Sequence, residues 1–307
     1  MEEDLFFNDE KLKEEILRLK KEREAIILAH NYQRPEVQDI ADYVGDSLGL
    51  SQQAAATEAK VIVFCGVHFM AETAYILSPQ KLVLLPDLRA GCPLADMITP
   101  DALKKMKAKY PGAPVVAYVN TSAAVKAEST VCSTSANSVQ IIESMQNRRV
   151  IFVPDENLGK YVARKTNKEI ILWKGKCPTH HKIKRESVLR LKKDHPQAKF
   201  VAHPECRQDV LELADKICGT SGMVKYVKQD PSREFIIGTE LGIIHRLKRE
   251  NPNKEFYALE EAICPNMKLI TLDKVYRSLK TLTPKVTVPE DIRLKALNAV
   301  QKMISIT

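Results

Sequence analysis

The sequence has no CxxC pair among its seven cysteines, no unbroken apolar run long enough to cross a membrane, and no basic block interleaved with aromatic residues. The missing CxxC pairs argue against an ordinary structural zinc site, which usually takes four protein ligands in close pairs. The most apolar stretch, residues 61–77, is interrupted by His68 and Glu72, so we expect no membrane partner. Because lysine and arginine alternate with acidic residues, we also expect no nucleic-acid partner, despite the net charge of +8.

The start of the chain is acidic and then amphipathic, and no basic stretch leads into an apolar run there. We therefore expect no secretory signal and a cytoplasmic location. In a reducing compartment, an odd number of scattered cysteines favours buried thiols or metal ligands over a disulfide framework. The modest excess of positive charge is compatible with small anionic substrates.

Three of the seven cysteines are followed directly by proline, and the other four are not. These are Cys92, Cys177 and Cys264, which lie 85 and 87 residues apart along the chain. A motif that recurs at nearly one interval indicates an internal repeat.

Short apolar runs recur at the same interval, and helical patterns separate them. The first runs of each repeat are residues 25–30, 115–120 and 199–204; the second are 61–65, 150–154 and 234–238; the third are 81–85, 169–173 and 255–259. Such alternation is typical of parallel sheets covered by helices. We predict an α/β protein of three pseudo-threefold-related, Rossmann-like α/β/α sandwich domains with short parallel sheets around a central cluster site. The predicted domains are residues 1–96, 97–181 and 182–268, followed by C-terminal helices in 269–307 that pack back on the first repeat.

Polar side chains stand in register just past the first run of each repeat. They are His30 and Tyr32, then Tyr118 and Asn120, then His203 and Glu205. A small hydroxyl residue that could open a helix follows at Ser47, Ser135 and Thr220. Taken singly, each would be read as a helix cap or a core histidine. Their shared register instead predicts ligand contacts at the carboxyl ends of the strands, with anion sites at the helix starts.

The three Cys-Pro loops follow the last run of each repeat, so pseudo-threefold symmetry would bring their sulfurs together. Iron-sulfur clusters accept widely spaced cysteines, and Cys-Pro is familiar in their binding loops. Three ligands for four irons would leave one iron open as a Lewis acid able to bind substrate oxygens and promote loss of water. Two alternatives stay open at this stage: a zinc ion that merely joins three repeats of a binding protein, and a cluster-dependent hydratase acting on a small hydroxy acid.

The whole chain resembles the quinolinate synthase family, the iron-sulfur enzymes of NAD biosynthesis. The resemblance rests on stretches such as LAHNYQRPEVQDIADYVGDSL, PDLRAGCPLADM, PDENLGKYV, HPEC, TSGM and CPNMK. It implies a 4Fe-4S cluster on Cys92, Cys177 and Cys264, and the condensation of iminoaspartate with dihydroxyacetone phosphate to quinolinate, phosphate and two waters. It also implies these substrate-binding residues: His30, Ser47, Tyr118, Asn120, Ser135, His203, Glu205 and Thr220. Glu205, Tyr32 and His203 are the implied catalytic residues.

The chain departs from some relatives in having Pro265, Asn266 and Met267 after Cys264, where those relatives carry extra cysteines proposed as a thiol switch. Redox regulation by that route is therefore not expected. The pattern leaves open whether His180 or His181 contacts substrate. An aspartate oxidase or dehydrogenase that produces iminoaspartate is the expected functional partner.

Overall fold

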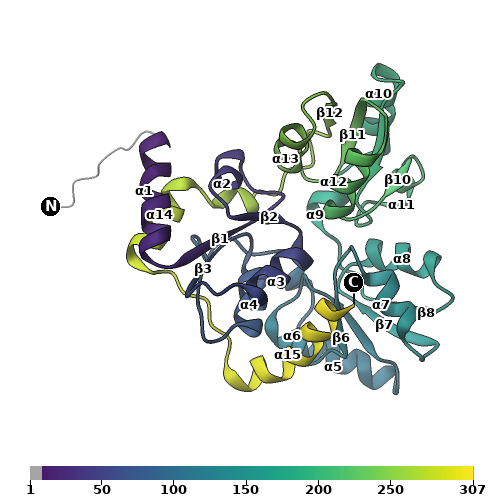
Figure 1. Ribbon diagram of the computed structural model, residues 1–307. Coiled ribbons are helices and arrows are strands. Elements are labelled where there is room, and N and C mark those ends of the chain that lie inside the picture. The colour runs from purple at the N-terminus through teal and green to yellow at the C-terminus, as the bar shows by residue number, and fades with distance from the viewer. Residues whose placement is uncertain (1–8, 307) are drawn as a thin grey trace.

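The computed structural model describes residues 9–306 and consists of three α/β units that meet at the centre of the molecule (Figure 1). Each unit contains one four-stranded parallel sheet with helices beside it. All three sheets have the same strand order, with the second strand at one edge, the first and third inside, and the fourth at the other edge. The predicted three Rossmann-like α/β/α repeats are thereby confirmed.

The elements follow one another in the same sequence in each unit. The first unit contains α1 (Asp9–Glu22), β1 (Ala25–His30), α2 (Pro35–Asp39), β2 (Tyr43–Gly45), α3 (Ser47–Ala56), β3 (Val61–Cys65), α4 (His68–Leu77), β4 (Leu82–Leu84) and the 3-10 turn η1 (Ala95–Met97). The second contains α5 (Pro100–Lys109), β5 (Val115–Tyr118), α6 (Ala123–Ala127), β6 (Val131–Ser133), α7 (Ser138–Ser144), β7 (Arg149–Val153), α8 (Glu156–Lys165), β8 (Glu169–Leu172) and α9 (Pro178–His181). The third contains α10 (Arg185–Asp194), β9 (Lys199–Ala202), α11 (Gln208–Leu211), β10 (Lys216–Ile217), α12 (Thr220–Gln229), β11 (Glu234–Gly238), α13 (Ile243–Glu250), β12 (Glu255–Ala258) and η2 (Met267–Leu269).

The sequence pattern predicted three strands in each repeat, whereas the structure has four. The additional strands are β2, β6 and β10, which contain only three, three and two residues. Their sequences, YVG, VCS and KI, contain no apolar run like those that mark the other strands, so the pattern contains nothing to detect.

One side-chain contact repeats in all three units and shows how closely they correspond. The backbone N–H of Ile27 donates to Asp42 Oδ2 at 2.8 Å, that of Val115 to Thr130 Oγ1 at 2.9 Å, and that of Phe200 to Asp215 Oδ2 at 2.8 Å. Each pair is separated by 15 residues. In every unit, the loop before the short second strand is thus tied to the first strand.

The inner strands supply the core because helices cover both sides of each sheet. Every residue of β3 and β5 is buried, and Phe64, Phe152, Phe200 and Phe235 have almost no solvent contact. Burying one such side chain contributes about 1.5–3 kcal/mol relative to exposure. The core therefore holds the strands rigidly, with their carboxyl ends directed toward the centre of the molecule.

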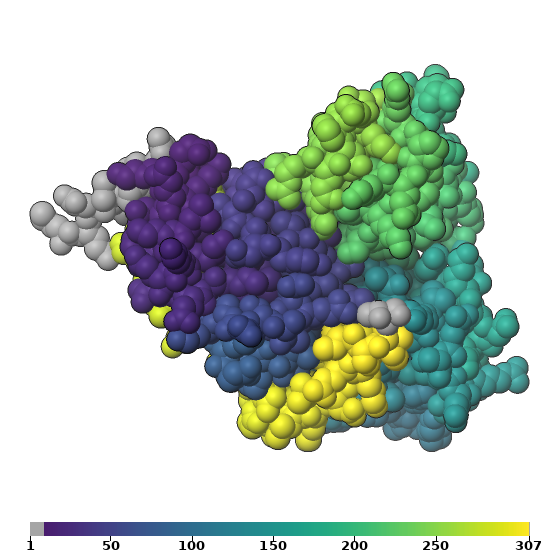
Figure 2. Space-filling model, in the orientation of Figure 1, coloured from purple at the N-terminus to yellow at the C-terminus, as the bar shows by residue number. Residues whose placement is uncertain are grey.

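Two C-terminal helices follow the third unit. Helix α14 (Leu272–Thr281) packs on α1 and β3. Helix α15 (Glu290–Ser305) begins after Pro289 with two acidic residues, as predicted, and lies across α4, α6 and β6 (Figure 2, yellow). The C-terminal helices therefore contact the first unit and, in addition, the second. The domain boundaries after residues 96, 181 and 268 stay predictions.

No helix within residues 9–306 is both long enough and apolar enough to span a lipid bilayer.

Asp87 fixes α14 to the loop after β4. Its carboxylate accepts from the Arg89 backbone and side chain and from Lys274 Nζ at 2.7 Å. The Arg89 and Lys274 contacts outweigh burial and hold the Asp87 pKa below its usual value.

We expect Asp87→Asn to lower the free energy of unfolding by about 1–2 kcal/mol, since a partly screened charge-assisted bond is lost. Because the folded-state pKa is the lower one, the stabilisation is complete above the unfolded pKa of about 4 and disappears as the pH falls through the folded-state value. Urea unfolding at pH 7 and at stepwise lower pH measures both effects. Glu22→Gln, which breaks an exposed ion pair with Arg18, is the control and should cost less than about 0.5 kcal/mol. An Asp87→Asn effect that does not diminish with falling pH would contradict this assignment.

Candidate active site

Residues from all three units line one central cavity with a volume of about 160 Å³. Every site residue predicted from the sequence lies on its wall: His30, Tyr32, Ser47, Cys92, Tyr118, Asn120, Ser135, Cys177, His203, Glu205, Thr220 and Cys264. The register of the three repeats therefore brings together side chains that are far apart in the chain.

The first strands of the first two units end at the cavity with His30 and Tyr118, and His203 directly follows β9; all three side chains are buried. His30 Nδ1 accepts a hydrogen bond from the Tyr32 backbone N–H, and His203 Nδ1 accepts one from the Glu205 N–H. Burial is the main cause that lowers the pKa of each imidazole to about 3. Both histidines are therefore neutral, and Nε2 of His203 reaches Ser135 Oγ at 3.2 Å.

Two of the three predicted hydroxyl residues stand in the first turn of a helix. Ser47 and Thr220 are the first residues of α3 and α12, and the capping positions belong to Asp46 and Gly219. Their hydroxyls are therefore not used as the N-caps of these helices.

Ser135 differs from this expectation, since α7 begins only at Ser138. The side chain of Asn137 accepts the Thr134 N–H at 2.9 Å and holds residues 134–137 in a turn. Ser135 lines the cavity from this turn and not from a helix start.

The hydroxyl of Thr220 is oriented by a chain of hydrogen bonds from two other elements. Asn31 Nδ2 donates to Thr220 Oγ1 at 2.9 Å, while Asn31 Oδ1 accepts from Arg246 Nη1 at 3.0 Å. Arg246 also donates to the carbonyl of Val44 at 2.7 Å. Because Thr220 Oγ1 accepts from Asn31, its own proton is left to donate elsewhere, and Thr220 lines the cavity.

The three Cys-Pro cysteines lie on the cavity wall as free thiols. Burial raises the pKa of Cys92 to about 12, and burial likewise raises the pKa values of Cys177 and Cys264. A cation bound among them would offset that burial and favour the thiolates. Three partly buried thiols on three loops that line one cavity are therefore suitable ligands for a metal centre.

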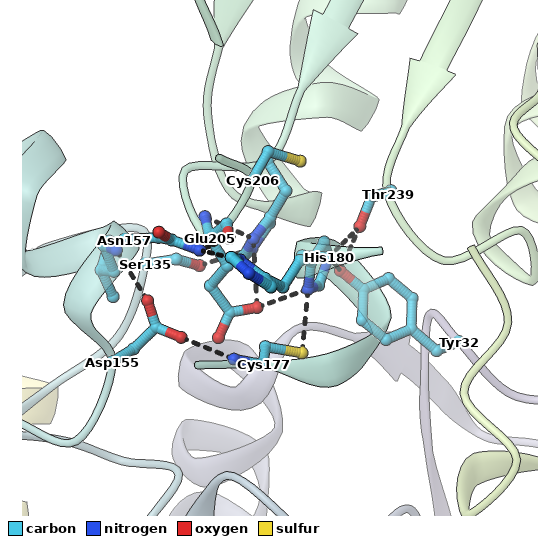
Figure 3. Close-up of polar contacts among 12 residues, drawn as sticks. Tyr32, Ser135, Asp155, Asn157, Cys177, His180, Glu205, Cys206 and Thr239 are labelled. Carbon is cyan, nitrogen blue, oxygen red and sulfur yellow. Dashed lines mark hydrogen bonds and ion pairs between the residues drawn. The ribbon is translucent and has the colours of Figure 1, made fainter. Parts of the chain in front are cut away.

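The other four cysteines are also free: Cys65, Cys132, Cys206 and Cys218. None of them lines the cavity. Cys206 follows Glu205 directly, but its thiol points away from Cys177 and toward the carbonyl of Gly238 (Figure 3).

Glu205 and His180 form the polar centre of the site (Figure 3). His180 Nδ1 lies 2.7 Å from Glu205 Oε2 and 3.2 Å from Cys177 Sγ. Among residues 9–306, Cys177, His180 and Glu205 are the one group whose ligand atoms are close enough to hold a metal ion. The other carboxylate oxygen, Glu205 Oε1, is buried and has no hydrogen-bond partner in the described part of the chain.

The ionisation of Glu205 reflects opposing effects. Burial raises its pKa, but His180, His203 and the Tyr118 hydroxyl together lower the pKa below its usual value. Burial also raises the pKa values of Tyr32 and Tyr118 well above normal, so both phenols keep their protons. The site thus combines one carboxylate with neutral hydrogen-bond donors.

A hydrogen-bonded chain continues from His180 to Tyr32 through a residue that the sequence pattern did not select. Thr239 Oγ1 lies 2.8 Å from His180 Nε2 and 2.5 Å from the Tyr32 hydroxyl. Thr239 directly follows β11, so the strand-end rule that selected His203 could also have found it. Of the two histidines after Cys177, His180 is buried on the cavity wall, while His181 does not line the cavity and contacts Asn157.

Fold and site together define an α/β enzyme of three repeats, with a candidate thiol metal centre in a cavity lined by polar side chains of all three units. The family model described as quinolinate synthetase A protein matches residues 14–305. The chain therefore belongs to the quinolinate synthetase A family.

Curated relatives match the chain over nearly its full length. It is 58% identical to a quinolinate synthase of Desulforudis audaxviator over 95% of this chain and 97% of that protein. It is 57% identical to quinolinate synthase 1 of Methanosarcina acetivorans, over 95% and 96% of the two chains. It is 56% identical to the quinolinate synthase of Geotalea uraniireducens, over 98% and 99%.

Proposed function

We propose that this protein is a quinolinate synthase that condenses iminoaspartate with dihydroxyacetone phosphate and releases phosphate and two waters. The proposal rests above all on one observation: the register positions of three repeats, with their three cysteines, line a single cavity. The family to which the chain belongs supports the same activity. A cytoplasmic location and a link to an enzyme that produces iminoaspartate remain predictions from the sequence.

We propose Cys92, Cys177 and Cys264 as ligands of a 4Fe-4S cluster. Their position as partly buried free thiols on one cavity wall and the partnerless oxygen Oε1 of Glu205, which lies near Cys177, support this assignment. When bound, such a cluster has one iron without a protein ligand, and it supplies Lewis-acid chemistry for dehydration.

The remaining wall suits two anionic substrates. Ser47, Ser135 and Thr220 can donate hydroxyl protons to carboxylate or phosphate oxygens, and the neutral histidines at positions 30 and 203 can donate from Nε2. Asn120 Oδ1 is buried without a partner in the described residues, so it can accept a hydrogen bond from a substrate imine or hydroxyl. Hydrogen-bond donors supplied by three units suit the condensation of two anionic substrates better than the hydration of a single hydroxy acid.

Proton transfer is assigned to the hydrogen-bonded path that runs from Glu205 through His180 and Thr239 to Tyr32. A carboxylate hydrogen-bonded to His180 can accept a proton from substrate carbon, and the Tyr32 phenol can donate one to a departing hydroxyl. Thr239 and His180 lie between them and can return the proton. The direction of transfer would then alternate between tautomerisation and dehydration.

The function is tested with protein purified without oxygen and analysed for iron and sulfide. Quinolinate should form only when iminoaspartate and dihydroxyacetone phosphate are both present, with one phosphate released per quinolinate. Water exchange on a hydroxy acid without phosphate release would favour the hydratase alternative. A folded protein that carries zinc and has no turnover would reject the proposal.

Asn31→Asp tests the orientation of Thr220. The new carboxylate would accept a hydrogen bond from the Thr220 hydroxyl and would place a negative charge beside the proposed anion site. Because substrate binding would be weakened, we expect KM to rise about tenfold with little change in kcat. Steady-state kinetics with each substrate varied in turn measures the effect.

The exposed Asn147→Asp, whose amide bonds only to the Gly112 carbonyl, is the matched control and should leave KM unchanged. If Thr220→Val raised KM while Asn31→Asp did not, the orienting role would be wrong.

A further inference from the structure

Two buried carboxylates hold the backbones of two of the three cysteine loops. Asp155 Oδ2 accepts the N–H of Cys177 at 2.9 Å, and Glu240 Oε1 accepts the N–H of Cys264 at 3.2 Å. The cysteine lies 22 residues after the carboxylate in one case and 24 in the other. Both side chains are fully buried, and Figure 3 shows the Asp155 contact directly below the polar centre of the site.

The two carboxylates occupy the same position in their repeats. Asp155 stands two residues after β7, and Glu240 stands two residues after β11. In the first unit the corresponding residue after β3 is Val67, which has no polar side chain. The Cys92 loop is held from another unit instead, because Asn266 Nδ2 donates to the carbonyl of Gly91 at 2.7 Å.

Both carboxylates are fixed in orientation by further bonds. Asp155 Oδ1 accepts the N–H of Leu158 at 2.7 Å and so caps α8. Glu240 Oε2 accepts the N–H of Gly242 at 2.7 Å, and Lys268 Nζ lies 3.0 Å from Glu240 Oε1. Each loop contact is therefore made by an oxygen that cannot rotate away without breaking another bond.

We propose that Asp155 and Glu240 are positioning residues of the metal centre, which keep the Cys177 and Cys264 thiols directed into the cavity. This inference rests on the proposed function, in which these cysteines hold the cluster. Outer hydrogen bonds that orient metal ligands usually affect metal affinity by 10–100-fold. In this chain the orienting bonds are made to the ligand backbone, and two of the three repeats carry them.

The test compares Asp155→Asn and Glu240→Gln with the wild type. An amide offers one oxygen where each carboxylate offered two, so in either orientation its NH₂ group faces a backbone N–H and one bond is lost. We expect the loaded variants to release iron to a chelator about tenfold faster or more, with an altered EPR spectrum of the reduced cluster.

Asp215→Asn is the matched control. It replaces a carboxylate that likewise accepts a backbone N–H, at the amino-terminal end of β9 and outside the cavity. It should keep the wild-type release rate and spectrum.

Melting of the apoproteins separates loss of metal from loss of fold. If Asp155→Asn unfolds because α8 loses its cap, Glu240→Gln still decides the question. Wild-type release rates in Glu240→Gln and in any folded Asp155→Asn, or an equal acceleration in Asp215→Asn, would overturn the proposal. The readout is independent of turnover, so a loaded wild type that makes no quinolinate would reject the proposed function and leave this comparison intact.

Discussion

Cys177→Ala is expected to lose bound iron and to reduce quinolinate formation about 10³-fold or more. A Lewis-acid metal contributes several kcal/mol to the stabilisation of the transition state, and each 1.4 kcal/mol corresponds to a factor of ten in rate. Cys177 is also the cysteine most closely joined to the rest of the site, through its N–H to Asp155 and its sulfur near His180. Iron and sulfide analysis together with anaerobic turnover measures both losses.

Cys92→Ala and Cys264→Ala should behave in the same way, because the proposed centre takes one thiol from each repeat. Cys65→Ala is the control: its thiol is buried at the end of β3 and does not line the cavity. It should keep its iron and its turnover. An iron-free Cys177→Ala protein with wild-type turnover would show that the three Cys-Pro cysteines do not hold a metal needed for the reaction.

Glu205→Gln is expected to keep the metal and to lose turnover by a factor of about 10²–10⁴, the usual range for removal of a general acid or base. Glutamine has nearly the shape of glutamate but cannot accept a proton from substrate carbon. Its amide can still bond to His180, so the geometry of Figure 3 is largely retained. The measurement is kcat with the iron content determined on the same sample.

The control for this substitution is Glu212→Gln, an exposed glutamate in the same unit whose carboxylate accepts from Gln208 at 2.9 Å. It should change neither iron content nor kcat. If Glu205→Gln retained full turnover with its metal intact, proton transfer would have to be assigned to another group.

Much of the fold could be predicted because the same pattern of apolar runs and helical stretches recurs three times along the chain. A single short run such as residues 61–65 does not identify a parallel sheet, but three sets at one interval do. The edge strands β2, β6 and β10 were not predicted because their few residues, unlike those around β4, form no apolar run. Their position depends on side chains such as Asp42 and Asp215, whose roles appear only once the strands are paired.

The cavity wall was predictable for residues at strand ends and in the Cys-Pro loops, since parallel strands place those positions at one edge. Contacts between repeats were not predictable. His180 and Thr239 come from different units, and Tyr32 from the remaining one, so no sequence spacing relates the three. Ser135 shows the opposite error, because Asn137 folds the residues before α7 into a turn that the register of the other repeats does not contain.

The junctions between the units differ in chemical character. Helix α15 joins the first and second units with buried Ala296, Ala299, Val300 and Met303. On the surface, the first and third units meet where His245 and Arg249 both contact the Asp39 carboxylate. Apolar contacts are insensitive to dissolved salt, whereas exposed charges are screened within about 8–10 Å at physiological ionic strength. Rising ionic strength therefore weakens the exposed Arg249–Asp39 pair, while the buried hydrogen bond from Asn31 to Thr220 across the same junction is little affected.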